Sequence, residues 1–179
     1  MENYTIRTLI PEEELKAGIK RVADEINKEY AGKTVHLICV LKGGVYFLTE
    51  LSNYITDADV TIDFMSVSSY GAGLKSTGVV KIIKDLDEPI EGKDVIIVED
   101  IIDSGLTMHY LKELLYARKP NSITTVSFLD KANAHSVDLK TDLVGFEISN
   151  EFVVGYGLDY ANYYRNLPYI GILKPECYE

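Results

Sequence analysis

The sequence predicts an α/β fold, with a doubly wound, mostly parallel central sheet flanked by helices. Apolar runs rich in Val and Ile recur along the chain and predict buried strands, and segments with apolar residues at helical spacing alternate with them. The length of 179 residues and the hydrophobic content of 46% suit one domain with a substantial core. We therefore expect a single domain over residues 1–179.

The first half of the chain alternates helical and strand patterns. Its first helix is Glu-rich at the start and amphipathic along its length. A turn at Gly43 and Gly44 separates the next strand from the next helix. The helices are expected over residues 11–30 and 45–54, and the strands over 35–41, 60–67 and 79–84. Residues 68–78, rich in Gly and hydroxyl side chains, have little to bury and favour a mobile active-site lid.

The second half continues the alternation and ends in short strands. A helix is expected to run to about Arg118, because Lys119-Pro120 is a stop signal. The strands are expected over residues 95–98, 123–129, 143–148, 152–155 and 169–173.

Charge and composition exclude several classes of protein. A formal net charge of -10 at pH 7 disfavours nucleic-acid binding, which needs clustered Lys and Arg to neutralise phosphates. No apolar run approaches the ~20 residues that cross a bilayer, and no signal-peptide pattern opens the sequence. Neither Cys39 nor Cys177 has a paired Cys or His at the spacing of zinc ligands. The sequence therefore predicts neither a disulfide nor a zinc site. We expect a cytoplasmic protein that binds neither membrane nor nucleic acid.

One run carries the strongest functional signal. A β-branched strand at 95–98 leads into Glu99 and Asp100, and an Asp-Ser-Gly-Leu-Thr loop follows at 103–107. Such loops open helices, whose first amides lack intrahelical partners and can receive a phosphate. Acids at the carboxyl end of a parallel strand also lie where α/β sheets bind ligands. The alternative is that the loop only caps a helix and that the two acids are solvated.

This run resembles the phosphoribosyl-diphosphate signature of the purine phosphoribosyltransferases, in particular their hypoxanthine-guanine branch. The resemblance covers about Val35 to Leu173 in the family's order. Its other segments are Leu41-Lys42-Gly43-Gly44, Ser68-Ser69-Tyr70, Asp130-Lys131 and Phe152 to Tyr156, followed by Asp159 and Arg165. It implies the type I fold, with a core over about residues 35–140 that includes the lid loop 68–78, and a small hood from about residues 1–10 and 141–179.

The resemblance implies transfer of a phosphoribosyl group from 5-phosphoribosyl 1-diphosphate to hypoxanthine or guanine, with release of diphosphate. The transition state would resemble an oxocarbenium ion, so the site must exclude water. Glu99 and Asp100 would bind the ribose hydroxyls with the help of Mg²⁺, and Asp103 would act as general base or proton carrier at the purine. The 5′-phosphate would be bound by Asp103, Ser104, Gly105, Leu106 and Thr107. Some relatives carry Lys where Leu106 stands, so phosphate affinity would depend more on amides and hydroxyls.

Further segments of the resemblance imply a diphosphate site. It would be formed by Lys42, Gly43, Gly44, Ser69, Tyr70 and Arg165. The resemblance also implies a cis peptide bond between Lys42 and Gly43. Without the family, the Gly-Gly turn reads equally well as ordinary packing between a strand and a helix.

The purine site is implied in the same way. Lys131 would read the 6-oxo group, because an ammonium group only donates hydrogen bonds and therefore disfavours the 6-amino group of adenine. Phe152 would stack on the base and the Val153 backbone would meet its edge. Asp159 would lie beside the base and would join Glu99 and Asp100 in binding metal. Without the resemblance, position alone would favour a different interpretation. Lys131 would be an exposed surface lysine, and Phe152 and Val153 would be a pair of core residues in a strand.

Three other readings stay open. A relative that prefers xanthine would share all these motifs. A regulator with the same fold would keep the phosphoribosyl site but bind nucleic acid, which the acidic charge disfavours. A non-catalytic flavodoxin-like binding module would leave the matches at Lys131, Phe152 and Asp159 unexplained. The resemblance also favours a homodimer or homotetramer.

Overall fold

The larger of two sheets in the structure is mostly parallel. The structure is a computed structural model that describes residues 5–69 and 80–177. Six strands pair in the order β4-β3-β2-β5-β6-β7, and only β4 runs antiparallel to its neighbour. Their bounds are Thr34–Leu41 for β2, Asp59–Ser69 for β3, Val80–Lys84 for β4, Asp94–Ile102 for β5, Ser122–Asp130 for β6 and Leu143–Glu147 for β7.

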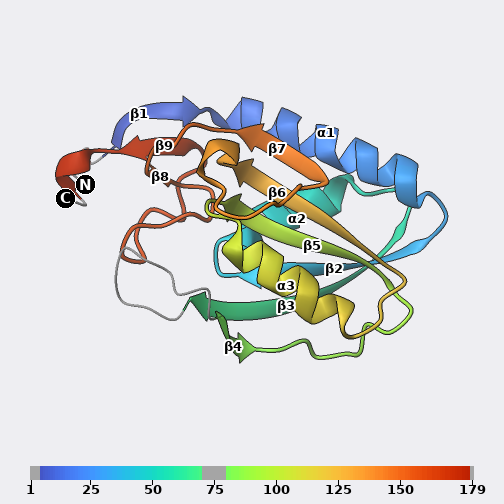
Figure 1. Cartoon of the computed structure of the whole chain (residues 1–179). Coiled ribbons are helices and arrows are strands. Elements are labelled where there is room, and N and C mark those ends of the chain that lie inside the picture. The colour runs from blue at the N-terminus through green and yellow to red at the C-terminus, as the bar shows by residue number, and fades with distance from the viewer. Residues whose placement is uncertain (1–4, 70–79, 178–179) are drawn as a thin grey trace.

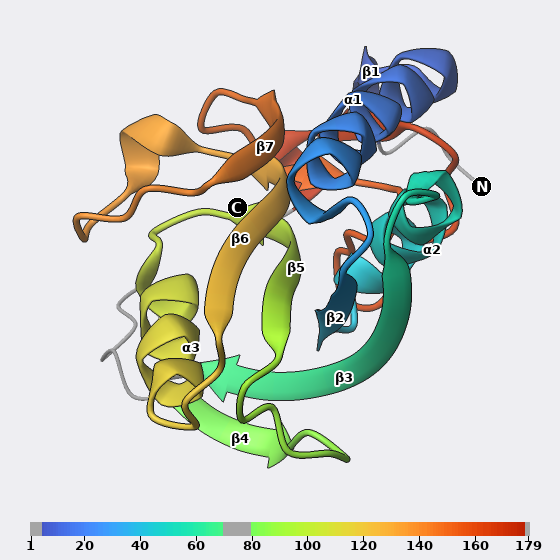
Figure 2. The same ribbon diagram turned by 90° about the vertical axis from the view of Figure 1, so that its right-hand side faces the viewer.

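Helices cover both faces of this sheet, as the doubly wound prediction requires. The helices are α1 (Glu12–Tyr30), α2 (Gly44–Tyr54) and α3 (Leu106–Tyr116). The first two pack on one face and α3 on the other (Figures 1 and 2). Successive strand side chains point to opposite faces, so Ile96 joins the core under α1 and α2 while Ile97 joins the core under α3. A strand buried on both faces reads as a continuous apolar run.

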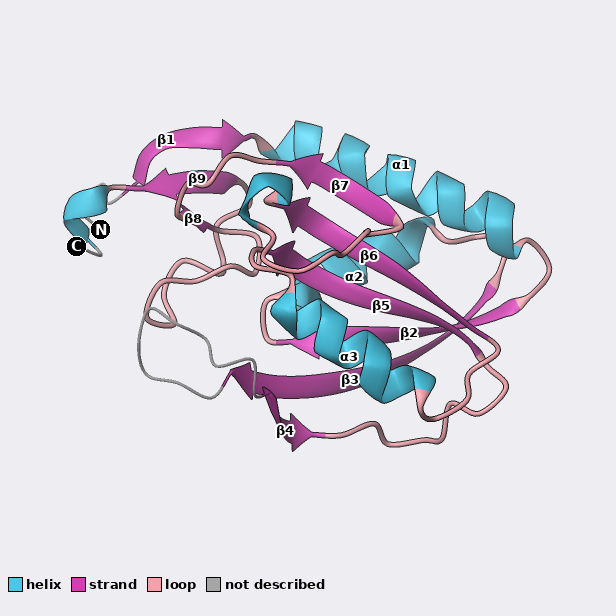
Figure 3. Ribbon diagram, in the orientation of Figure 1, coloured by secondary structure: helices cyan, strands magenta, loops and turns pink. Residues whose placement is uncertain are grey.

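A second, smaller sheet lies beyond the carboxyl ends of the parallel strands (Figure 1). It is antiparallel, with the order β1-β9-β8, and combines residues from both ends of the chain. The bounds are Thr5–Ile10 for β1, Val153–Val154 for β8 and Ile170–Leu173 for β9. Two short 3-10 turns, Ala132–Ala134 and Pro175–Cys177, complete the described elements (Figure 3).

The structure differs from the sequence prediction in three places. Strand β5 does not end at Val98 but continues through the acids to Ile102, because it keeps pairing with β6 as far as Asp130. Strand β7 belongs to the large sheet through its pairing with β6, although the sequence predicts a hood from residue 141 onward. Strand β3 extends through Ser69, and most of the predicted lid, residues 70–78, lies outside the described residues. No helix in the described ranges is long and apolar enough to cross a membrane.

Candidate active site

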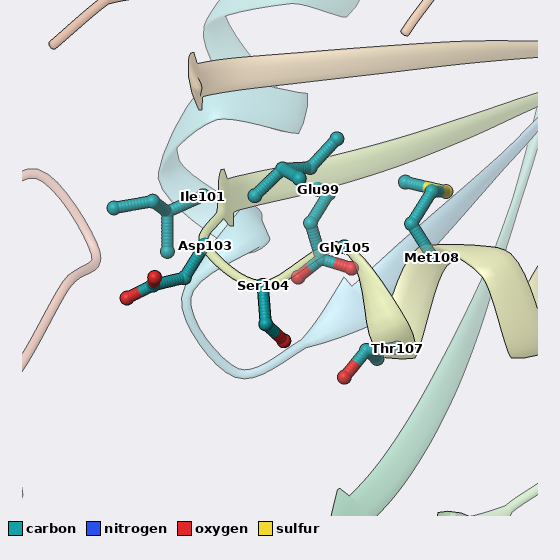
Figure 4. A pocket seen from close by; sticks show the side chains of 8 residues that line it. Glu99, Ile101, Asp103, Ser104, Gly105, Thr107 and Met108 are labelled. Carbon is teal, nitrogen blue, oxygen red and sulfur yellow. The ribbon is translucent and has the colours of Figure 1, made fainter. Parts of the chain in front are cut away.

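The Asp-Ser-Gly-Leu-Thr loop joins the carboxyl end of β5 to the start of α3. Gly105 adopts a left-handed backbone with φ of 80°, and α3 begins at the next residue without a side-chain cap at Gly105. The capping alternative is therefore weak, since Ser104 Oγ accepts only a long 3.5 Å hydrogen bond from the Leu106 amide within the described part of the chain. A cavity of about 120 Å³ lies at this loop, and Ser104 and Thr107 line it. Figure 4 shows the Asp103 carboxylate pointing away from both hydroxyls.

The surroundings of Gly105 are tightly packed, and its backbone conformation favours glycine. A Cβ atom there would lie 3.1 Å from Val137 Cγ2 and 3.2 Å from Leu139 Cδ2. A positive φ is also costly for residues other than glycine. The loop is thus pressed against the segment that follows β6.

The two acids at the end of β5 are strongly desolvated. Glu99 is buried, and its Oε2 has no hydrogen-bond partner within the described part of the chain. Burial raises the pKa of Glu99 well above its ordinary value, and the adjacent charge of Asp100 raises it further. Burial likewise raises the pKa of Asp100. Two neighbouring carboxylates in this state are a good donor set for Mg²⁺, which takes one or two carboxylates and completes its shell with water and phosphate.

The Lys42-Gly43-Gly44 turn lies directly against Asp100. A Cβ atom on Gly43 would lie 1.5 Å from Asp100 Oδ2, so only glycine fits here. The structure has a non-proline cis peptide bond in this turn, between Leu41 and Lys42. The predicted bond, between Lys42 and Gly43, was therefore wrong by one residue. Nothing in the residue types distinguishes two consecutive bonds of one turn.

A loop near the end of the chain approaches the same turn. Gly157, with φ of 100°, would place a Cβ atom 2.1 Å from the Gly43 carbonyl oxygen. Arg165 donates to the Gly157 carbonyl over 2.6 Å and forms an ion pair with Asp159 at 2.7 Å. The Arg165 charge also acts to lower the pKa of Asp100, against the larger effect of burial. Gly157 is not among the site residues predicted from the sequence, although the Gly-Tyr-Gly run at 155–157 signals an unusual backbone there.

Asp159 does not join the two strand acids in one metal cluster. Within residues 5–69 and 80–177, no group of three or more His, Cys, Asp or Glu side chains is close enough to bind one ion. The predicted set of Glu99, Asp100 and Asp159 is thus divided between a carboxylate pair on β5 and a single carboxylate held by Arg165. Spacing along the sequence could not reveal this division.

Lys131 is paired with the acid of the phosphate loop. Its side chain is only 9% exposed, and Nζ donates to Asp103 Oδ2 over 3.1 Å. The reading of Lys131 as an exposed surface lysine is therefore incorrect. The Asp103 side chain is 59% exposed, so the ion pair lies at the edge of open solvent.

Two of the remaining predicted residues, Val153 and Phe152, lie in or next to the small sheet. Val153 is buried in β8, which pairs with β9 on one side and forms the edge of that sheet on the other. Phe152, partly buried, meets Tyr160 edge-on with ring centres 5.8 Å apart. Ser69 ends β3, and Tyr70 lies outside the described residues, so the predicted lid contacts have no structural account.

Comparison with known proteins identifies similar chains over the full length. The family model for the phosphoribosyl transferase domain matches residues 9–161. A hypoxanthine-guanine phosphoribosyltransferase of Bacillus subtilis is 53% identical over 179 residues, which covers 100% of this chain and 99% of the relative. The bifunctional protein TilS/HprT of Listeria monocytogenes serotype 4b is 51% identical over 178 residues, but the chain spans only 27% of that longer relative.

Solved structures agree with the sequence comparisons. A crystal structure of a hypoxanthine phosphoribosyltransferase from Staphylococcus aureus superposes with a TM-score of 0.95 at 47% identity, covering 100% of this chain and 97% of the other. A hypoxanthine-guanine phosphoribosyltransferase from Bacillus anthracis, solved with a HEPES molecule in its active site, gives a TM-score of 0.91 at 47% identity over 95% of this chain and 99% of the other.

Proposed function

This chain belongs to the phosphoribosyltransferase family, and we propose that it transfers the phosphoribosyl group of 5-phosphoribosyl 1-diphosphate to hypoxanthine or guanine. The products are inosine or guanosine monophosphate and diphosphate. The observation that supports this proposal best is the pairing of Lys131 with Asp103 at the phosphate loop. It brings a proton acceptor and a hydrogen-bond donor for a 6-oxopurine next to the site of the sugar phosphate.

The sugar phosphate binds at the start of α3. The first amides of this helix and the hydroxyls of Ser104 and Thr107 receive the 5′-phosphate, which the positive end of the helix dipole favours. The carboxylates of Glu99 and Asp100 bind the ribose hydroxyls. As the sugar loses diphosphate, nearby carboxylates stabilise the positive charge that develops on it.

The purine binds between Lys131 and the edge strand β8. The ammonium group of Lys131 donates to the 6-oxo oxygen, Asp103 accepts the proton of the ring nitrogen, and Phe152 stacks on the ring. The outer edge of β8 at Val153 offers backbone groups to the purine edge. Hypoxanthine and guanine present the 6-oxo acceptor, whereas adenine presents a donor that meets the Lys131 donor.

The diphosphate binds between the two loops that meet at Gly43 and Gly157. Backbone amides of the Lys42-Gly43-Gly44 turn face it, with Arg165 and the lid residues Ser69 and Tyr70 completing the site. The Glu99 and Asp100 pair would hold Mg²⁺, and Asp159 would hold a second ion. That metal would coordinate the neutral ribose hydroxyls and would supply the positive charge that offsets the negative charge of the leaving diphosphate. The unpaired buried oxygen of Glu99 is consistent with such a ligand role.

Two alternatives are less well supported. A preference for xanthine would use the same site and differs only at the purine edge near Val153. A nucleic-acid-binding regulator is disfavoured by the net charge of -10 and by the high identity to the B. subtilis enzyme along its whole length. We also propose a cytoplasmic location, a homodimer or homotetramer, and one domain whose hood is built from the chain ends.

The decisive experiment measures nucleotide formation from phosphoribosyl diphosphate and Mg²⁺ with hypoxanthine, guanine, xanthine and adenine supplied separately. We expect turnover with hypoxanthine or guanine and little with adenine. Dominant use of xanthine would replace the proposed specificity, and no turnover with any base would favour the regulator.

A further inference from the structure

The segment from Lys131 to Asp142, which joins β6 to β7, is fixed by a buried carboxylate. Asp130, the last residue of β6, has a side chain only 6% exposed. Its Oδ1 lies 2.7 Å from His135 Nε2, and its Oδ2 accepts a 3.1 Å hydrogen bond from Thr141 Oγ1. Both partners belong to the segment itself. Loss of a hydrogen-bond partner from a buried carboxylate strongly destabilises the folded state. These two contacts therefore hold the segment against the end of the sheet.

The same segment contacts the phosphate loop. The Ser136 amide and hydroxyl both donate to the Ser104 carbonyl oxygen, over 2.9 Å and 3.1 Å. The side chains of Val137 and Leu139 lie against Gly105, within 3.2 Å of where a Cβ atom would stand. The residue next to His135 is therefore bonded to the loop that is proposed to bind the 5′-phosphate.

The other end of the segment carries the purine lysine. The Lys131 amide donates to the Ile102 carbonyl oxygen over 2.9 Å, and its Nζ reaches Asp103. A single 3-10 turn, Ala132–Ala134, separates Lys131 from His135 (Figure 3). One short stretch of backbone thus supports both the base contact and the phosphate loop, and His135 ties that stretch to Asp130.

We propose that His135 is a positioning residue that keeps Lys131 and the Ser104–Gly105 loop in their binding geometry together. The inference rests on the proposed function, because it assigns to these two groups the base and the sugar phosphate. Its particular consequence is that disturbing one contact, Asp130 with His135, weakens the binding of both substrates at once.

Replacing His135 by Phe tests this because Phe keeps a planar ring but cannot donate to Asp130. We expect the KM values for phosphoribosyl diphosphate and for hypoxanthine to rise together, each by about fivefold, with kcat changed less than about twofold. His135→Gln should restore both KM values to within about twofold of the unaltered enzyme, since the Gln side-chain nitrogen lies as many bonds from Cα as His Nε2. His109→Phe is the matched control, because the His109 side chain is half exposed on α3 and its ion pair with Glu113 lies within its own helix.

Three outcomes would overturn the proposal. One is a lowered melting temperature with both KM values unchanged, which would make the contact merely structural. Another is a rise in only one KM. The third is that His135→Gln shows the same raised KM values as His135→Phe. The rise would then be due to the shape of the ring and not to the hydrogen bond with Asp130.

A second readout separates this proposal from the proposed function. Hydrogen exchange of peptides that contain residues 103–107 requires no turnover. We expect these amides to exchange about fivefold faster in His135→Phe than in the unaltered chain or in His109→Phe. If the unaltered chain makes no nucleotide yet this exchange difference is found, the proposed function fails and the support by His135 remains. Equal exchange in all three chains overturns the support by His135 whatever the activity.

Discussion

Asp103 and Lys131 form an ion pair, and both have a role in the proposed chemistry at the purine. Nζ of Lys131 lies 3.1 Å from Asp103 Oδ2 on the exposed side of the site. In the absence of substrate each charge neutralises the other. A 6-oxopurine brings an acceptor for the ammonium group and a ring N–H for the carboxylate, so it can replace their mutual contact with two hydrogen bonds.

Asp103→Asn should lower kcat far more than it weakens substrate binding. Asn keeps an oxygen that accepts from Lys131 but cannot take a proton, and general-base catalysis contributes about 10²-fold or more. We expect kcat with hypoxanthine to fall about 10²-fold, while the KM for phosphoribosyl diphosphate stays within about threefold. Steady-state kinetics with both substrates varied measures this. An unchanged kcat would remove Asp103 from the chemistry.

Lys131→Ala should affect the base more than the sugar. Loss of a charged donor to the 6-oxo oxygen should lower kcat/KM for hypoxanthine by about 10- to 100-fold, with the KM for phosphoribosyl diphosphate changed less than about twofold. Lys140→Ala, an exposed lysine in the same segment, is the control and should match the unaltered enzyme. Wild-type kinetics toward hypoxanthine in the Lys131 variant would show that the base binds elsewhere.

At the scale of elements, strands and helices formed by contiguous residues could be predicted from the sequence. The strands with which they pair could not. The apolar run, the acids and Gly105 follow one another in the sequence, so the unit of β5, loop and α3 could be read directly. The end of β5 could not, because polar Glu99 and Asp100 lie in a strand that is kept extended by pairing with β6. The residues of strand β7 would likewise suit either sheet. Its long-range pairing with β6 places it in the large sheet.

A buried acid on β3 helps to hold the connection after β4 in place. Asp63 is 4% exposed and accepts hydrogen bonds from the amides of Phe64, Asp87 and Glu88. Burial by itself would raise the pKa of Asp63, but these three amide donors and the Lys84 ammonium outweigh it, so that the pKa is lowered.

Asp63→Asn should therefore destabilise the protein in a pH-dependent way. Because the pKa of Asp63 is lower in the folded than in the unfolded chain, its stabilising effect is complete above the unfolded value of about 3.9 and is lost as pH falls through the folded value. We expect the variant to lose roughly 2 kcal/mol of unfolding free energy at pH 7, with a smaller difference from wild type at pH 3. Urea unfolding at both pH values measures this. An equal or larger difference at pH 3 would contradict the prediction.

Across the whole molecule, the proposed site lies between the carboxyl ends of the parallel strands and the small sheet (Figure 1). The large sheet contributes Asp100 and the Gly43 turn, and the loop after β8 contributes Gly157 and Arg165. Sequence order gives no sign that Gly43 and Gly157 touch, because that contact depends on how the small sheet sits on the ends of the parallel strands. For the same reason, the roles of single motifs could be proposed from the sequence, but the pairing of Lys131 with Asp103 could not.

Gly157→Ala tests whether this contact shapes the diphosphate site. A Cβ atom there meets backbone, 2.1 Å from the Gly43 oxygen, so the two loops must separate. Gly92→Ala is the matched control, since Gly92 also has a positive φ but a Cβ atom there would meet nothing within 4 Å. Both variants bear the cost of a left-handed alanine, about 1 kcal/mol. Only Gly157→Ala should also raise the KM for phosphoribosyl diphosphate, by about tenfold, because the turn against Asp100 moves. Equal KM values in the two variants would mean that the small sheet does not position the diphosphate turn.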